Sequence, residues 1–249
     1  MSDQQQDKPV VLPHGLNSLI VRFGLKARPD LTAAVRAFEA ELAANPIAGV
    51  TQFAGSLATV LVEFDPNVGV RSVIASELAD RLALRDWIKV TPAPPLRRWT
   101  IPVAFGGEAG PQFAESARLS GQSEEAAVAE ICAQDLDVLC FGFAPGQAYL
   151  GFLPETWNIP RLPELSPNVP SGALILAIRQ LILFAKDNPT GWRHIGQSGF
   201  RPFELLRDPS ILLKPRDVLR FSPISALELE MIEKDNADGL GHARLEVLT

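Results

Sequence analysis

The first half of the chain alternates between two kinds of hydrophobic pattern. Residues 18–23 (SLIVRF) and 53–64 (FAGSLATVLVEF) are rich in β-branched and aromatic side chains, which is typical of strands. Residues 31–44 and 70–84 instead place apolar side chains three and four positions apart, as on one face of a helix. The order strand, helix, strand, helix predicts a small α+β domain over residues 17–88.

The pattern changes after a proline-rich segment, residues 89–98 (KVTPAPPLRR). We interpret this segment as a semi-rigid linker, because its prolines lack amide donors and favour extended backbone. Residues 99–225 consist mainly of short apolar runs separated by Gly and Pro, which predicts a β-barrel or a sandwich. A helix beginning near Ser123 interrupts the runs. The continuous apolar run 173–184 fits either a buried helix or two strands.

The two ends of the chain carry weaker patterns. Residues 1–16 are polar and punctuated by Pro and Gly, so we predict a flexible tail. The C-terminal segment 226–249 begins with helical spacing and ends at residues 243–249 (ARLEVLT), which alternate as in a strand. A strand without a partner leaves backbone groups unpaired. It therefore either joins an edge of this chain's own sheet or pairs with another polypeptide.

Composition and charge exclude several classes of protein. The chain has 249 residues with 23 Lys+Arg against 29 Asp+Glu, and the net charge of -6 argues against nucleic acid as a partner. No apolar run reaches the ~18 residues needed to span a membrane, and the N-terminus does not resemble a secretion signal. Cys132 and Cys140 are the two cysteines, without the spacing of a zinc site or a disulfide framework. We expect a cytoplasmic protein without a metal.

Common phosphate-binding and hydrolase motifs are absent, and a Pro145–Gly146 turn draws attention instead. The turn follows an apolar run that ends at Phe143 and precedes Tyr149, the only tyrosine. Such a turn can aim backbone amides at an anionic or carbonyl ligand. The alternative is a tight surface turn with aromatic side chains packed beneath it, and spacing alone favours that alternative.

Three further side chains have suitable chemistry. Arg161 and Arg193 can bind a carboxylate or phosphate with two hydrogen bonds, and His194 can transfer a proton near neutral pH. Taken singly, each has a simpler explanation. An isolated arginine usually forms a surface ion pair, and an isolated histidine is more often structural than catalytic. Cys132 and Cys140 are expected to be core thiols.

Several short motifs, taken in order, resemble the carboxyltransferase subdomain C/D family, also called allophanate hydrolase subunit 1. That family includes the B subunit of 5-oxoprolinase and a Kip-type inhibitor of a sporulation histidine kinase. The motifs are residues 101–111 (IPVAFGGEAGP), 142–146 (GFAPG), 149–151 (YLG), 160–161 (PR), 169–172 (VPSG), 191–192 (GW), 195–196 (IG) and 217–221 (DVLRF).

The resemblance implies a small α+β domain followed by a cyclophilin-like β-barrel, in which the run 173–184 forms two strands around a turn. It also implies a second cyclophilin-like protein, the C subunit of 5-oxoprolinase, as the partner. Their shared cleft is implicated in ATP-dependent opening of a cyclic amide or in carboxyl transfer. ATP is accordingly the expected cofactor, and a small amide is the expected substrate.

The resemblance and the turn chemistry together select one group of candidate site residues. Arg161 and His194 are the expected catalytic residues. Residues Pro145, Gly146, Gln147 and Tyr149 are expected to bind the substrate. We expect Pro145, Gly146, Tyr149 and Arg161 to line one concave face of the barrel, with His194 nearby.

The sequence also departs from the family pattern at positions where an aromatic residue, a histidine, an acid or a glycine is usual. The departures are Gln147 for Phe, Cys132 for His, Gln112 for Asp, Ile178-Arg179 for Gly-Gly, Thr190 for Gly and Arg216 for Gly. Arg and Ile tolerate positive φ angles poorly, so the lost glycines predict altered hairpins.

Three functions remain open at this point. The chain is either a component of a 5-oxoprolinase or related ATP-dependent amide hydrolase, or a non-catalytic regulator of a signalling protein such as a histidine kinase. The third alternative is a divergent paralogue whose substrate has changed or been lost. We further expect a partner that resembles the C subunit at or near residues 243–249, with a self-docked or disordered C-terminal strand as the alternative.

Overall fold

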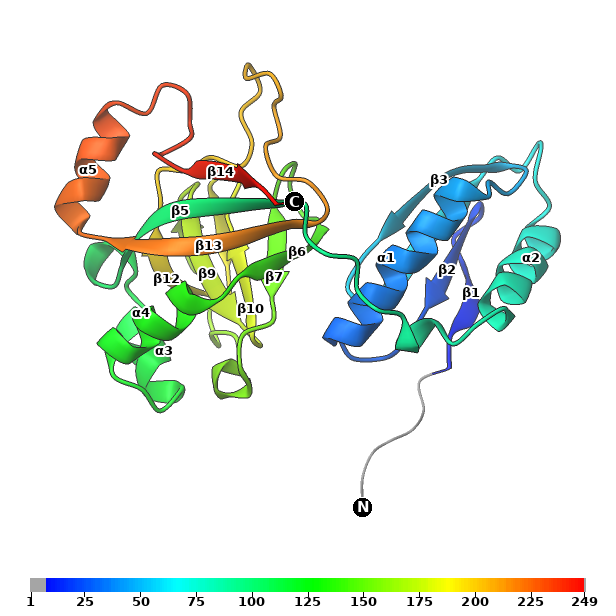
Figure 1. Cartoon of the computed structure of the whole chain (residues 1–249), viewed down its shortest axis with the longest axis horizontal. Coiled ribbons are helices and arrows are strands. Elements are labelled where there is room, and N and C mark those ends of the chain that lie inside the picture. The colour runs from blue at the N-terminus through cyan, green and yellow to red at the C-terminus, as the bar shows by residue number, and fades with distance from the viewer. Residues whose placement is uncertain (1–7, 249) are drawn as a thin grey trace. The chain divides into compact units, whose positions relative to one another are not determined.

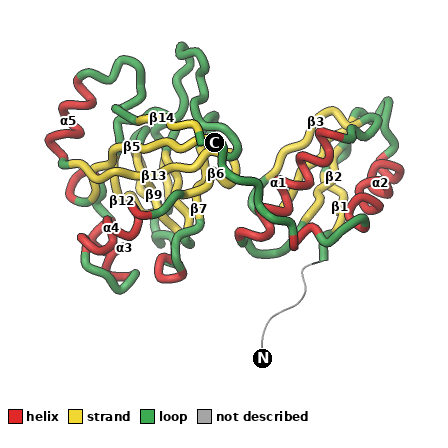
Figure 2. Tube along the Cα trace, in the orientation of Figure 1, coloured by secondary structure: helices red, strands yellow, loops and turns green. Residues whose placement is uncertain are grey.

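The structure, a computed structural model, describes residues 8–248 and divides into two compact units at the Ala93–Pro94 junction (Figure 1). That junction lies inside the proline-rich segment. The N-terminal unit combines a sheet with two α-helices, and the C-terminal unit is a closed barrel with short helices (Figure 2). The predicted α+β class and barrel are therefore confirmed. Each unit has a buried apolar cluster of its own.

Within residues 8–93, four antiparallel strands form a sheet in the order β1-β2-β4-β3. Alternate residues of β4 are buried, and α1 buries side chains at the spacing of three and four that the sequence predicts. Both sets join one apolar core. The elements are β1 (Val10–His14), β2 (Ser18–Arg22), α1 (Pro29–Ala44), β3 (Val50–Gly55), β4 (Thr59–Phe64), α2 (Arg71–Ala83) and a 3-10 helix (Trp87–Lys89).

The prediction of a flexible tail over residues 1–16 is wrong for β1. This strand pairs with β2 from Val10 opposite Arg22 to His14 opposite Ser18, and Val11 packs against the core. A proline such as Pro13 argues against a strand because it lacks an amide donor. β1 is an edge strand, however, and such a residue is tolerated there. Gly15, at φ +57°, makes the turn to β2. Residues 1–7 of the predicted tail lie outside the described residues.

Within residues 94–248, seven strands close into a barrel in the order β12-β9-β10-β7-β6-β13-β5, because β12 also pairs with β5. The longest pairing is parallel, between β13 and β5. The strands are β5 (Arg97–Phe105), β6 (Leu136–Phe141), β7 (Ala148–Gly151), β9 (Ala173–Ala177), β10 (Gln180–Leu183), β12 (Arg193–Gln197) and β13 (Asp217–Ile224). The other elements are α3 (Phe113–Leu119), α4 (Glu124–Ala133), β8 (Ser166–Val169), β11 (Asn188–Thr190), α5 (Ala226–Lys234) and β14 (Arg244–Val247), with short 3-10 helices at Gly107–Ala109 and Glu155–Trp157.

The predicted linker, residues 89–98, is too long at its C-terminal end, because β5 already begins at Arg97. The Arg97 guanidinium lies 2.6 Å from the carboxylate of Asp217, which is 1% exposed. The same carboxylate accepts a hydrogen bond from Trp99 Nε1 at 3.2 Å. A buried carboxylate needs such partners, so this ion pair fixes the start of β5 against β13.

The run 173–184 forms two strands, β9 and β10, joined by Ile178 and Arg179. Both turn residues have positive φ, +50° and +65°, so the expectation of an altered hairpin is wrong here. Arg179 supplies the compensation. Its Nε donates to the Leu153 carbonyl at 2.7 Å, its guanidinium pairs with Glu155, and its amide donates to the Trp157 carbonyl at 3.0 Å. The left-handed turn is therefore held by contacts outside the hairpin.

The C-terminal strand β14 pairs antiparallel with β5, from Arg244 opposite Thr100 to Val247 opposite Arg97. Of the two alternatives raised by the sequence, the strand has therefore joined this chain's own sheet. β14 pairs with no other strand in the described part of the chain, so its second edge is open. Among the helices of residues 8–248, none has the length and apolar character needed to cross a membrane.

Candidate functional site

The barrel wall has an outer face that carries several of the candidate residues. Paired residues on neighbouring strands project to the same side of a sheet. His194 of β12 pairs with Ile175 of β9, Ile175 with Ile182 of β10, and Ile182 with Tyr149 of β7. Ile175 and Ile182 belong to a small apolar cluster separate from the barrel interior. We call the surface formed by these four residues the outer face.

The side chains of Tyr149 and Arg161 both contact the ring of Trp192, and we name these three residues the Trp192 cluster. The rings of Tyr149 and Trp192 meet edge to face, with centroids 6.1 Å apart. The Arg161 guanidinium lies 5.5 Å from the centroid of the Trp192 ring. Trp192 is 7% exposed, Tyr149 is half-buried and Arg161 is exposed. The structure thus brings together two of the predicted site residues through an aromatic ring.

The polar groups of the Trp192 cluster are unpaired. Neither the Arg161 guanidinium nor the Tyr149 hydroxyl forms a hydrogen bond or ion pair with any residue from 8 to 248. Burial raises the pKa of Tyr149, and the nearby Arg161 charge partly offsets this effect. The phenol is therefore neutral near pH 7 and can donate a hydrogen bond. A free guanidinium beside a phenol is suited to an anionic ligand.

Arg193 plays a different part from the one considered in the sequence. Its guanidinium lies 2.5 Å from Glu115 of α3, and the arginine side chain is 6% exposed. Its Nε donates to the Pro160 carbonyl at 3.3 Å. Because the charge is already neutralised, Arg193 is not available to a ligand. It instead fixes the residue that precedes Arg161.

His194 lies on the outer face, two residues after Trp192 along the chain. Its strand β12 is separated from β7, which carries Tyr149, by three strand spacings, or roughly 14 Å measured along the sheet. The imidazole is 7% exposed, its Nε2 has no hydrogen-bond partner in residues 8–248, and burial lowers its pKa. The backbone amide donates to Gln112 Oε1 at 2.8 Å, so the glutamine at the usual aspartate position anchors β12.

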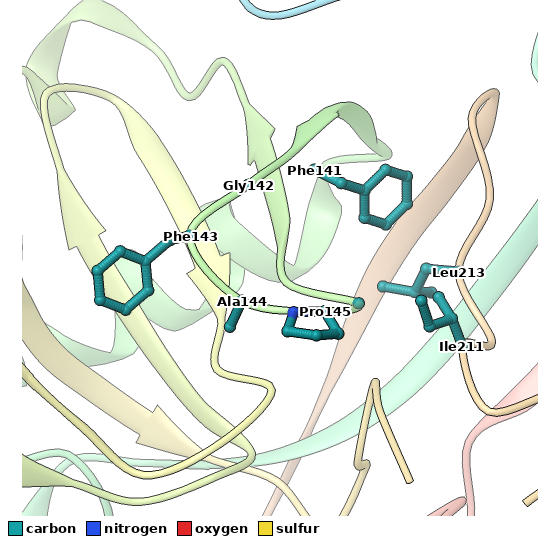
Figure 3. A pocket seen from close by; sticks show the side chains of 8 residues that line it. Phe141, Gly142, Phe143, Ala144, Pro145, Ile211 and Leu213 are labelled. Atoms are coloured by element: carbon teal, nitrogen blue, oxygen red, sulfur yellow. The ribbon is translucent and has the colours of Figure 1, made fainter. Parts of the chain in front are cut away.

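Pro145 and Gly146 line a cavity of about 510 Å³ at the side of the barrel (Figure 3). The opposite wall is formed by Ile211 and Leu213 (Figure 3). Gly142 also lines this cavity and connects it to the Trp192 cluster, because a Cβ at Gly142 would lie 3.7 Å from the Tyr149 ring. The cavity and the cluster are therefore neighbours.

The side chain of Gln147, which follows Gly146 in the same turn, is buried. It is 2% exposed, and its Oε1 has no hydrogen-bond partner among residues 8–248. A buried amide oxygen without a partner loses its solvation, which destabilises the fold unless a ligand or water reaches it. The polar substitution at this aromatic position is thus not explained by any contact within the described chain.

Two aromatic residues at the site were not among the predicted site residues. Trp192 connects Tyr149 with Arg161, and its signal in the sequence is the GW motif at residues 191–192. Phe143 lines the cavity, is 74% exposed and has φ +70° (Figure 3). An exposed phenyl ring on a strained backbone is unusual, and neither property can be read from sequence.

Cys132 does not add a nucleophile to the site. Burial raises the pKa of the Cys132 thiol to about 11, so it stays protonated at neutral pH. No group of three or more His, Cys, Asp or Glu side chains with metal-binding geometry occurs in the part of the chain that the structure describes. The Trp192 cluster itself contributes an arginine and a tyrosine to the chemistry of the site.

Comparison with known proteins identifies relatives of this chain. The chain is 26% identical to the B subunit of 5-oxoprolinase from Bacillus subtilis (strain 168) over 234 residues, which is 89% of this chain and 95% of the relative. It is 37% identical to the B subunit of 5-oxoprolinase from Escherichia coli O157:H7 over 142 residues, 56% of this chain. That match spans 65% of the length of the Escherichia coli protein.

Solved structures show the same fold. The protein TTHA0988 superposes with a TM-score of 0.69 at 25% identity, covering 85% of this chain and 40% of that longer one. The Kluyveromyces lactis urea amidolyase superposes with a TM-score of 0.78 at 15% identity, covering 99% of this chain and 17% of that one. Residues 9–213 match the model of the carboxyltransferase domain, subdomain C and D. The chain belongs to that family.

Proposed function

We propose that this protein is the component of an ATP-dependent 5-oxoprolinase, or of a related amide hydrolase, that corresponds to the B subunit. The observation that carries the proposal is the match to the Bacillus subtilis B subunit over nearly the whole of both chains. The Trp192 cluster supports it, because an unpaired guanidinium and a neutral phenol are suited to a small anionic substrate. Cyclic amides that carry a carboxylate, such as 5-oxoproline, fit this description.

The reaction explains why ATP would be needed. A lactam is stabilised by resonance and resists attack by water, and phosphorylation of its oxygen would make the carbonyl carbon a better electrophile. Together, the outer face and the Trp192 cluster offer one unpaired cation, Arg161, whereas a triphosphate carries several negative charges. The residues of this face therefore do not fit a complete ATP site. We assign them to the amide substrate and expect partner residues to contact the nucleotide.

The partner in the proposal is a protein that resembles the C subunit of 5-oxoprolinase, and we call it the C-type partner. The word subunit in the names of the relatives supports a complex, and the open edge of β14 offers unpaired backbone groups for a strand of the partner. Pro145 and Gly146 are proposed to line the substrate cleft. The burial of His194 favours a role in positioning β12 over proton transfer.

Reconstitution with the C-type partner tests the function. We expect 5-oxoproline-dependent ATP hydrolysis by the complex and at least a roughly tenfold lower kcat/KM for Arg161→Ala, since a charge-assisted contact would be lost. Arg85→Ala is the matched control, because Arg85 also stacks on a tryptophan, 3.8 Å from the Trp87 ring, but in the N-terminal unit. A correctly associated complex without turnover would contradict the proposal.

A non-catalytic regulator is the second candidate. The exposed Phe143 ring beside an apolar cavity favours it, because protruding aromatic side chains often anchor protein partners. The two functions differ in one measurement. A regulator would bind a signalling protein through this surface, with Phe143→Ser weakening that binding, and would show no substrate-dependent ATP hydrolysis in the complex.

A further inference from the structure

We propose that the Trp192 cluster is a carboxylate-binding subsite, in which Arg161 binds both carboxylate oxygens and the Tyr149 hydroxyl donates a third hydrogen bond. The identity of the cyclic amide rests on the proposed function, whereas the carboxylate chemistry rests on the cluster alone. The subsite gives Arg161 a role in substrate binding, in place of the catalytic role expected from the sequence.

Arg161 differs from Arg97 and Arg193 in how its charge is used. Arg97 and Arg193 each pair with a carboxylate, at 2.6 Å and 2.5 Å, and so have no free charge. Arg161 lies over the Trp192 ring and forms no ion pair in the described part of the chain. A cation–π contact uses the charge of the guanidinium without using its N–H donors, and none of these N–H groups has a hydrogen-bond partner among residues 8–248. These groups have the planar fork geometry that matches a carboxylate.

The backbone on both sides of Arg161 is pinned to the segment that carries Trp192. The Pro160 carbonyl accepts from Arg193 at 3.3 Å, and the Leu162 amide donates to the Gly191 carbonyl at 2.7 Å. Arg193 is held in turn by Glu115. A long arginine side chain loses much conformational freedom on binding, and an anchored backbone and an aromatic support reduce that loss. The exposed arginine is therefore preorganised.

The charges at the cluster favour a monoanion. The Trp192 cluster holds one cation and no carboxylate, so a single carboxylate neutralises it. Tyr149 is protonated near neutral pH because burial raises its pKa, and it therefore donates a hydrogen bond to an anion. A phosphate would also fit the fork of Arg161, but its second charge would lack a partner here. We therefore choose the carboxylate, and inorganic phosphate serves as a competing probe.

Direct binding to the full-length chain, and to its complex with the C-type partner, tests the subsite by isothermal titration calorimetry. The probes are 5-oxoproline, 2-pyrrolidone, which is the same ring without the carboxylate, and inorganic phosphate. We expect 5-oxoproline to bind at least about tenfold more tightly than the other two. Arg161→Ala should weaken 5-oxoproline binding about tenfold or more, and Tyr149→Phe by a few-fold. Arg85→Ala should have no effect.

A conservative variant of Arg161 and four contrary results complete the test of the subsite. Arg161→Lys should recover only part of the affinity, because an ammonium keeps the charge without the fork. Equal binding of 2-pyrrolidone, tighter binding of phosphate, an unchanged affinity of Arg161→Ala, or no 5-oxoproline binding in either preparation would overturn the subsite. Carboxylate binding without turnover would contradict only the proposed function. Turnover that is insensitive to Arg161→Ala would contradict only the subsite.

Discussion

The buried imidazole of His194 is predicted to link stability to pH. Its pKa in the folded chain lies below the usual value of 6.5, because burial disfavours the charged form. The unfolded chain therefore binds more protons on acidification, and the free energy of unfolding should fall as the pH drops below about 6.5. His194→Gln should flatten this dependence. Urea unfolding at pH values from about 5 to 8 measures it.

The exposed His14 at the end of β1 provides the control. His14→Gln should leave the pH profile of the wild type unchanged. The groups that act on the imidazole besides burial are the backbone of Gly196 and the neutral amide of Gln197, and neither has a titration of its own. A wild-type slope that survives in His194→Gln would show that another group is responsible.

Two glycines with nearly the same φ should respond differently to a methyl group. Gly172 has φ +79° and a Cβ there would overlap the Ser198 carbonyl oxygen, whereas Gly121 has φ +78° and open space around it. We predict that Gly121→Ala lowers the free energy of unfolding by about 1 kcal/mol and Gly172→Ala by about 3 kcal/mol. Chemical denaturation compares them, and equal losses would contradict the role of the Ser198 contact.

The chemistry of a single residue could be predicted from its type, but its contacts in the folded chain could not. Arg161 and Tyr149 were selected by chemistry and by the family resemblance, and they do lie together. The position of His194 relative to Tyr149 depends on the order of the four strands β12, β9, β10 and β7, which no local pattern contains. The unpaired state of Arg161 and the paired state of Arg193 also depend on distant residues, so both arginines look alike in the sequence.

Among the elements, β14 offers the sharpest test of the partner. A chain ending at Ala243 lacks β14 but keeps Asn236, which donates to the Gly199 carbonyl at 2.6 Å and accepts from the Gly241 amide at 2.8 Å. We predict that this version stays folded and loses association with the C-type partner. Size-exclusion chromatography after co-expression measures association. Equal association of both versions would contradict the role of β14.

A chain ending at Glu233 is a less specific variant. It also removes Asn236, together with Leu240 and Ala243, which pack against the barrel core. We expect a lower melting temperature for this version, so a loss of association would not identify β14. The two truncations together separate an effect on the interface from an effect on the fold.

The elements show where local patterns suffice. The helical spacing over residues 31–44 predicts α1, because an amphipathic helix contains its own repeat. Residues 173–184 are buried on both sides as β9 and β10, so no polar positions mark a period of two. The family resemblance, and not the pattern, resolved that run. β1 could not be predicted, because Pro13 lowers the local preference for a strand and only the pairing with β2 makes the strand form.

For the whole molecule, the exposed segment between the two units predicts a preferred site of cleavage. Residues 91–96 are exposed and outside regular structure, while Trp87 is buried in the core of the N-terminal unit. An endoproteinase specific for lysine should cut after the exposed Lys89 and release a stable fragment beginning at Val90. Mass spectrometry identifies the fragments. Lys89→Gln should prevent the cut, and degradation without a stable fragment would contradict two independently folding units.

The general architecture was the most predictable property. The change from helical spacing to short apolar runs locates the boundary, since it reflects a change in how each unit buries its residues. Closure of the barrel was not visible in the residues alone, because β5 pairs with β12 and β13, which are distant in sequence. The resemblance supplied that closure.

The arginines in left-handed turns have a consequence for how this chain tolerates mutation. Arg216, at φ +68°, donates from Nε and Nη2 to the Pro94 carbonyl at 3.2 and 2.8 Å, much as Arg179 holds its hairpin. Each side chain offsets the backbone strain that it causes. Replacement by the family's usual glycine would remove the backbone strain, but it would also remove the hydrogen bonds that the arginine side chain donates. Glycine is therefore not a neutral substitution at either position. These positions are epistatic, because the effect of each residue depends on the distant carbonyl groups that its side chain has come to hold.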